Sequence, residues 1–271
     1  MAGLINTKMN TYKQKYYYLA RLLKLCIGYL IFLFAAFSLS SVASAASTAD
    51  TTESSIINQQ IWIDFYPHYY LNKRIEYYGD AGYRTIISER NWSRLYVRPS
   101  IKYHLNKTWE LHTGIGFFYT YYNNDIDQFE IRPWQGVQLN WPKWDKIGFK
   151  NLLRVEERIS YLTNNWSSDF ELRMRYKLSG KYDFNTKLYL SFYGEYFLPI
   201  SGNIKELYTN KGRSGIGLGY KPGKDWQLEF VFNWQGSRTG SGEKLNASDY
   251  IYQLKFKKVW KPLIHKRHNS K

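Results

Sequence analysis

The chain has 271 residues, with 38 Lys and Arg against 22 Asp and Glu, and a formal net charge of +16. Aromatic residues make up 19% of it, and the mean hydropathy is −0.52. So many aromatic side chains cannot stay solvated over most of the length, which excludes a largely disordered chain. The polar average argues against a bundle of membrane helices. Cys26 is the only cysteine, so neither a disulfide scaffold nor a thiolate zinc site can form.

The first 45 residues have the pattern of a secretory signal. They contain five basic residues and no acidic one, then an apolar run over 25–39, and then the small residues Val42-Ala43-Ser44-Ala45. This order predicts export, with cleavage near Ala45. The apolar run is shorter than the ~20 residues of a spanning helix, so an uncleaved anchor helix is the less favoured alternative.

After cleavage the chain keeps its basic excess and has no cysteine, which suits an oxidising compartment. A basic chain can bind nucleic acid, but export argues against that partner and favours a negatively charged lipid surface. We expect a disordered polar spacer over 46–58, a barrel over 59–258 and a basic periplasmic tail over 259–271.

Alternation of apolar and polar residues dominates the region between spacer and tail, which predicts β-strands. In one segment Leu228, Phe230 and Phe232 share a face that opposes the face of Gln227 and Glu229. Eleven such segments are expected, at about 60–71, 74–85, 92–105, 108–122, 126–141, 147–161, 168–179, 185–199, 211–221, 224–236 and 248–258.

Strand length and the placement of aromatic residues favour a membrane barrel over a secreted soluble barrel or sandwich. The segments are long enough for the ~9–11 residues of a tilted spanning strand, whereas soluble strands average about 5–6. Aromatic residues flank successive turns, as in an interfacial girdle. The expected interface residues are Tyr103, Trp109, Trp141, Phe149, Tyr220 and Trp226.

Short turns alternate with longer polar connections along the chain. Bacterial barrels usually have short periplasmic turns, long external loops and an even number of strands. We therefore predict an all-β fold, a transmembrane up-and-down antiparallel barrel of 10–12 strands with twelve favoured. The expected location is the outer membrane of a Gram-negative bacterium, as a monomer.

If the apolar face contacts lipid, the opposite face lines the lumen and carries both signs of charge. Charges in a narrow interior must pair to offset the cost of desolvation, so a structural plug of ion pairs is favoured. A narrow basic-lined pore selective for anions is the alternative. The expected lumen residues are Glu76, Asp80, Arg84, Arg94, Arg98, Lys102, Glu110, Glu130, Arg132, Arg154, Glu156, Arg158, Glu171, Arg173, Arg175, Lys187, Glu195, Glu229 and Lys255.

Catalytic and metal-binding motifs are weak in this sequence. His68 and His112 fall on the inward face and are the only candidates for a lipid-modifying enzyme, but no nucleophile pairs with them in the sequence. The acidic cluster over 123–127 is interpreted as a solvated turn rather than a calcium site. No cofactor or metal is therefore predicted, and an enzyme activity is left open as the less favoured alternative.

Several segments together resemble a known family. They are the aromatic first strand IWIDFYPHYYLNKRIEYYGDAGYR, the turn from Tyr103 to Trp109, the Arg132-Pro133-Trp134 strand and the charged strand from Arg154 to Arg158. The chain resembles the DUF2490 family over roughly 58–258. The resemblance implies an exported outer-membrane β-barrel and assigns no catalytic residue.

The sequence thus predicts an integral outer-membrane barrel, either structural or a narrow transport barrel, with an ion-paired lumen. The alternatives are a lipid-modifying enzyme and a barrel that binds surface partners through its loops at 199–211 and 235–249. The expected partners are outer-membrane lipid, including lipopolysaccharide, and the barrel-assembly machinery.

Overall fold

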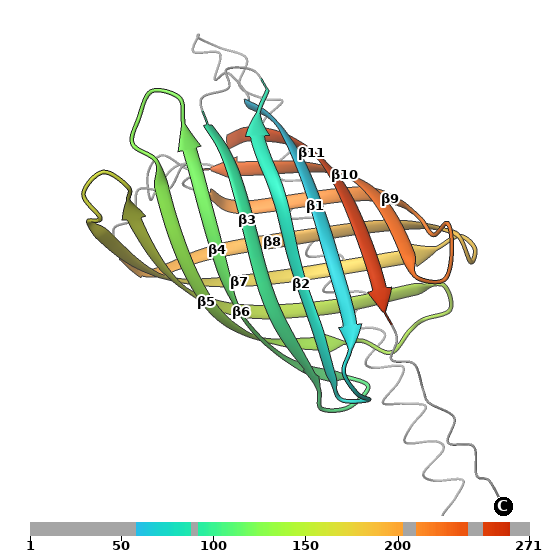
Figure 1. Cartoon of the computed structure of the whole chain (residues 1–271). Helices are drawn as coiled ribbons and strands as arrows, with labels where there is room; N and C mark the ends of the chain where they lie inside the picture. The colour runs from blue at the N-terminus through green and yellow to red at the C-terminus, as the bar shows by residue number, and fades with distance from the viewer. Residues whose placement is uncertain (1–57, 88–91, 203–209, 238–245, 261–271) are drawn as a thin grey trace, which may run out of the picture. The chain divides into compact units, whose positions relative to one another are not determined.

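The structure is a computed structural model that describes residues 58–87, 92–202, 210–237 and 246–260. These residues form one sheet of eleven strands that closes on itself as a barrel (Figure 1). The strands are β1 Asn58–Tyr70, β2 Ile75–Ile86, β3 Trp92–His104, β4 Trp109–Tyr122, β5 Gln128–Asn140, β6 Ile147–Leu162, β7 Ser168–Asp183, β8 Leu188–Gly202, β9 Asn210–Tyr220, β10 Trp226–Ser237 and β11 Asn246–Trp260.

The predicted all-β barrel is confirmed, and its eleven strands follow the eleven alternating segments of the sequence closely. The count lies within the predicted range of 10–12, but the favoured number of twelve is wrong by one. The reason is the closing pair: β1 and β11 run parallel, from Asn58 opposite Asp249 to Tyr69 opposite Trp260. A parallel closure satisfies the backbone of both edge strands with an odd number of strands, so no twelfth strand is needed.

All other neighbouring strands are antiparallel. Short connections at 71–74, 105–108, 141–146, 184–187 and 221–225 therefore lie at one end of the barrel, which we call the short-turn end. The arrowheads of β1 and β11 both point to this end (Figure 1).

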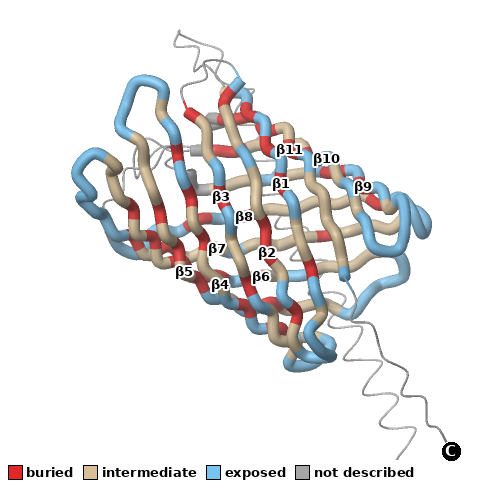
Figure 2. Tube along the Cα trace, viewed as in Figure 1, coloured by how far each residue is buried: buried red, intermediate tan, exposed pale blue. Residues whose placement is uncertain are grey.

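Burial is reversed relative to a water-soluble protein. Along most strands, buried positions alternate with half-buried or exposed ones (Figure 2), and the exposed ones are mainly large apolar residues. Phe230 is 48% exposed and Ile216 is 54% exposed, whereas Glu156 and Asp64 on the inner face are 0% exposed. Apolar side chains therefore cover the outside of the sheet, while charged and polar side chains fill its interior.

Three of the short turns share one mechanism. Asn72, Asn106 and Asn185 each accept two backbone N–H bonds at 2.8–2.9 Å from the residues two and three positions later. An asparagine side chain can replace a backbone partner in this way, which explains why it recurs at these turns. These turns fix the register of the hairpins β1–β2, β3–β4 and β7–β8.

The expected signal and the expected spacer up to residue 57 lie outside the described residues, as does the expected basic tail from residue 261. Asn58, expected in the spacer, begins β1, and β11 continues to Trp260, two residues past the expected strand end. None of the described residues belongs to a helix long and apolar enough to cross a membrane.

Candidate functional site in the barrel interior

Most of the charged residues expected in the lumen lie on the inner face of the barrel. Eleven of them are buried: Glu76, Asp80, Glu110, Glu130, Arg132, Arg154, Glu156, Arg158, Glu171, Arg173 and Glu195. The half-buried ones are Arg84, Arg94, Arg98, Lys102, Arg175, Glu229 and Lys255.

Lys187 was also expected in the lumen, but it does not lie on the inner face of a strand. It lies in the turn between β7 and β8, and its side chain is exposed at the short-turn end. The predicted segment began at residue 185, but the Asn185 turn delays the start of β8 until Leu188. The alternation of β8 therefore begins after Lys187, and it cannot be used to assign this residue to the lumen.

A cluster of arginine and glutamate side chains fills the centre of the interior, and Glu156 on β6 is its focus. The Glu156 carboxylate accepts bonds from Arg173 and Arg175 of β7 at 2.6 Å each, and from Arg154 at 3.3 Å. Arg132 of β5 lies 3.9 Å away. Because Glu156 is 0% exposed, its charge is compensated by these guanidinium groups rather than by water.

The same network extends around the wall in both directions. Glu130 of β5 accepts bonds from Arg132 and Arg158, and Arg158 also reaches Glu171 of β7 at 3.1 Å. Arg175 bridges from Glu156 to Glu195 of β8 at 2.6 Å. Planar guanidinium groups can contact two carboxylates at once, which lets one arginine join adjacent strands. We call this network over β5–β8 the central ion-pair cluster.

A second polar network holds the seam where the barrel closes. Gln60 of β1 donates to Asp249 of β11 at 2.7 Å, and Gln235 of β10 donates to the same carboxylate at 2.9 Å. Gln253 of β11 donates to Asp64 of β1. All of these side chains are buried, so the parallel pair carries side-chain bonds as well as its backbone ladder.

Sequence reasoning did not select these seam residues. Asp64 lies on the same face of β1 as Trp62 and His68, so alternation alone could have identified it as an inward-facing residue. Gln60 and Asp249 lie 189 residues apart in sequence, so their pairing depends on how the barrel closes.

The opposite flank of the seam carries a further ion pair. Arg98 of β3 contacts Asp80 of β2 through two bonds, at 2.8 and 2.6 Å. The Tyr96 hydroxyl lies 2.8 Å from Asp64 and 3.0 Å from Asp80. The guanidinium of Arg84 lies between the rings of Trp62 and Tyr96, at 3.9 and 4.5 Å from their centroids. Arg84 also lies 3.9 Å from the Asp64 carboxylate, so the aromatic faces add to the compensation of its charge.

Three histidines and two glutamates form one chain of contacts near the short-turn end. Glu76 contacts His68 and, at 3.2 Å, His104. Glu110 contacts His104 at 3.1 Å and His112 at 3.3 Å. Both ring nitrogens of His104 thus face carboxylate oxygens, and only a doubly protonated ring can donate to both.

His68 and His112, the weak catalytic candidates, are held in this chain. His112 contacts the Tyr78 hydroxyl at 2.6 Å through Nδ1 and Glu110 through Nε2, so both of its nitrogens are occupied. Within the described ranges, no serine or threonine hydroxyl is hydrogen-bonded to any histidine. No group of three or more His, Cys, Asp or Glu there could hold a metal ion.

Packing around Trp134 constrains the middle of the interior. Trp134 is 1% exposed, with Arg154 stacked 3.8 Å from its ring centroid. A Cβ added to Gly114 of β4 would lie 2.7 Å from both Trp134 Nε1 and the backbone oxygen of Pro99. Only glycine fits at this close approach.

We therefore expect Gly114→Ala to lower the free energy of unfolding by about 1–3 kcal/mol, because the backbone of β3 cannot move away. Gly148→Ala in β6 is the matched control, since a Cβ there meets nothing within 4 Å. Urea unfolding in lipid vesicles measures both. Equal stability of the two variants would contradict the packing described around Trp134.

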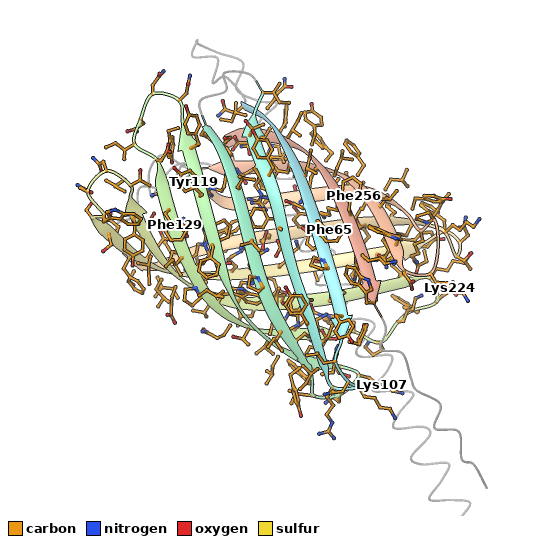
Figure 3. All side chains as sticks on the ribbon, in the orientation of Figure 1. Phe65, Lys107, Tyr119, Phe129, Lys224 and Phe256 are labelled. Atoms are coloured by element: carbon orange, nitrogen blue, oxygen red, sulfur yellow. The ribbon has the colours of Figure 1, made fainter. Side chains whose placement is uncertain are left out.

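The six expected interface aromatics all flank the short turns. Trp109, Tyr220 and Trp226 are exposed, at 42–43%, and Tyr103, Trp141 and Phe149 are half-buried. Other exposed aromatic residues lie at the same end, including Phe184 and Trp260. Figure 3 shows the side chains along the strands, with Phe65 and Phe256 on β1 and β11 and with Lys107 and Lys224 in short turns.

The outer face has few polar residues. Glu157 of β6 is one, because it immediately follows the inward-facing Glu156 and so points outward. Gln135 of β5 is another and is exposed. Apart from such positions, the middle of the outer face is mainly apolar, with Ile, Leu, Val, Phe and Tyr side chains predominating.

Comparison with known proteins identifies the family. A family described as "Protein of unknown function (DUF2490)" matches residues 59–246. No curated protein matches the chain. A solved structure titled as the NanC porin aligns with a TM-score of 0.43 and 10% identity, over 69% of this chain and 93% of that one. A similarity this distant transfers neither a solute nor a role. The family match spans most of the barrel, and the chain therefore belongs to the DUF2490 family.

Proposed function

We propose that this chain is an integral outer-membrane barrel whose centre is closed by ion pairs, and that it acts as a structural membrane protein rather than as an open pore. The observation that carries the proposal is the reversed distribution of side chains. Large apolar residues cover the outer face, and carboxylates and guanidinium groups are buried inside.

The outer face supports a lipid environment. Leu95 is 61% exposed, Leu218 is 57% exposed and Phe230 is 48% exposed, and residues of the same kind occupy the outer face of every strand from β1 to β11. Contiguous apolar patches larger than a few hundred Å² are rare on soluble monomers. A band of hydrocarbon around the barrel would remove this surface from water.

The expected export signal supports the outer membrane as the location. The short-turn end would face the periplasm, as in barrels of this kind. Closure through β1 and β11 leaves no unpaired sheet edge, so the barrel needs no partner strand and is proposed to be monomeric. Lipopolysaccharide and other outer-membrane lipids would contact the outer face, and the barrel-assembly machinery would insert it.

The burial of inward-facing side chains supports a barrel whose centre is closed. Glu156, Trp134, Val231 and Ile251 come from separate strands, β6, β5, β10 and β11, and each is at most 1% exposed. Paired charges that no solvent reaches do not form a wide aqueous path. The narrow anion-selective pore is therefore the less favoured version of the same barrel.

Planar bilayer recording tests this proposal directly. The purified chain should insert and give no steady open channel at neutral pH, in either low or high salt. Insertion is scored separately, by protection of the strands from protease added to vesicles. A stable conductance from inserted protein would contradict the closed centre, and failure to insert would contradict the membrane barrel.

The enzyme alternative is not favoured, because His68 and His112 contact glutamate carboxylates in a buried network. The loop-binding alternative depends on 199–211 and 235–249, and large parts of both loops lie outside the described residues.

A further inference from the structure

Four lysines on the inner face lack the ion pairs that the arginines have. They are Lys150 of β6, Lys177 of β7, and Lys255 and Lys257 of β11. Within the described part of the chain, no carboxylate oxygen lies within 4.0 Å of any of their ammonium groups. By contrast, Arg173 and Arg175 both contact Glu156 at 2.6 Å.

These lysines come from opposite walls of one part of the lumen. Around the barrel, β6 and β11 are separated by four strands on one side and by five on the other. Lys150 is the fourth residue of β6 and Lys257 is the fourth from the end of β11, so both lie toward the short-turn end. Lys150 lies within electrostatic range of Lys102 and Lys255, and Lys257 lies within range of Lys150.

Two tyrosine rings of β8 make cation–π contacts with ammonium groups in this part of the lumen. Lys177 and Lys255 approach the ring of Tyr193, at 3.8 and 5.8 Å from its centroid. Lys181 and Lys221 approach Tyr189 in the same way, at 4.1 and 5.3 Å. The rings hold several cations close together, although a cation–π contact compensates a charge only in part.

Nearby carboxylates are already engaged by other groups. Asp183 is shared by Lys143, Lys181 and Lys221. Glu229 accepts a bond from Ser191, and Glu195 is paired with Arg175. Glu76 and Glu110, which lie within electrostatic range of Lys257 and Lys150, already contact Lys102 and His104. The repulsion among the four lysines therefore has no full counter-charge from the described residues.

The lysines of this part of the lumen are more exposed than the carboxylates at the centre of the barrel. Lys150 is exposed although it points inward, and Lys177, Lys255 and Lys257 are half-buried. The carboxylates of the central ion-pair cluster are far less accessible, and Glu156 is 0% exposed. The lumen thus has a buried centre and a more exposed basic end, and we call this end the lysine chamber, defined by Lys150, Lys177, Lys255 and Lys257.

We propose that the lysine chamber binds a small oxyanion carrying two or more negative charges, entering from the short-turn end. Ammonium groups act as point charges for phosphate-like oxyanions, and a multivalent anion would relieve the repulsion between the two walls. The proposal goes beyond the closed structural barrel, because it assigns a ligand-binding site. It requires the barrel fold but not insertion into a membrane, so the two proposals can fail separately.

Calorimetric titration of the full chain in detergent with inorganic pyrophosphate, at low salt, tests the chamber. We expect one saturable site whose affinity falls as salt is added. The double variant Lys255→Gln/Lys257→Gln should bind at least about ten-fold more weakly, because each lost charged hydrogen bond is worth about 1.5–3 kcal/mol. Lys150→Gln, on the opposite wall, should weaken binding as well.

Two control variants separate the chamber from other basic regions. Lys73→Gln/Lys107→Gln removes exposed lysines from turns at the same end, and Lys261→Gln/Lys266→Gln removes charge from the C-terminal segment. Both should leave the affinity unchanged. The proposal is overturned if no saturable binding occurs, if the chamber variants bind as the unaltered chain does, or if a control variant abolishes binding. A heat-dependent shift in gel mobility checks that each variant is folded.

Discussion

Glu156→Gln should lower the free energy of unfolding by about 3–5 kcal/mol, the cost of removing one partner from a buried ion pair. Glu156 is 0% exposed and accepts bonds from Arg173, Arg175 and Arg154. A neutral amide of the same size would leave these guanidinium groups buried without their shared counter-charge. Urea unfolding in lipid vesicles, followed by tryptophan fluorescence, measures the loss.

Glu157→Gln is the matched control, because it makes the same chemical change one residue along the same strand. Glu157 points away from the central ion-pair cluster, so its substitution should leave stability unchanged or raise it slightly by removing a charge from the outer face. A loss of equal size in both variants would contradict the assignment of Glu156 as the focus of the interior.

Ile216→Arg should destabilise the protein in a bilayer by about 2–4 kcal/mol, the cost of an arginine on the lipid face near the middle of a barrel. Ile216 is 54% exposed at the middle of β9 and lies between Phe192 of β8 and Phe232 of β10. If the same surface faced water, an exposed Ile→Arg change would alter stability by only about 0.5 kcal/mol. Urea unfolding of the variant and of the unaltered chain in lipid vesicles measures this difference in the free energy of unfolding.

Thr186→Arg provides the control for this prediction. Thr186 is exposed in the turn between β7 and β8, beyond the ends of the strands. The same arginine there should leave the free energy of unfolding unchanged within about 0.5 kcal/mol. If Ile216→Arg were equally harmless, the outer face would not be a lipid-facing surface.

Much of this fold could be predicted because a period of two is a local property of the sequence. Leu228 and Phe230 alternate with Gln227 and Glu229 whatever the rest of the chain does, and the strand β10 follows from this pattern. The number of strands, by contrast, is not a local property of the sequence. It depends on whether β1 and β11 meet in parallel, and their partners Gln60 and Asp249 lie 189 residues apart.

For the interior, the sequence predicts which residues face inward but not which of them contact one another. Alternation selected Glu156 and Arg175 as inward residues, but not the fact that Glu156 would have several arginines around it. Such neighbours depend on strand tilt and register, which no local pattern specifies. The lysine chamber was missed for the same reason: Lys150 and Lys255 stand on opposite walls, and only the closed barrel brings them toward one space.

The central claim is that apolar side chains face hydrocarbon while ionic side chains face the barrel axis. Fractionation of Gram-negative cells that express the full chain tests it most directly. The account predicts that the protein sediments with the outer membrane, withstands a carbonate wash and is released only by detergent. Recovery of folded protein from the aqueous fraction without detergent would contradict it.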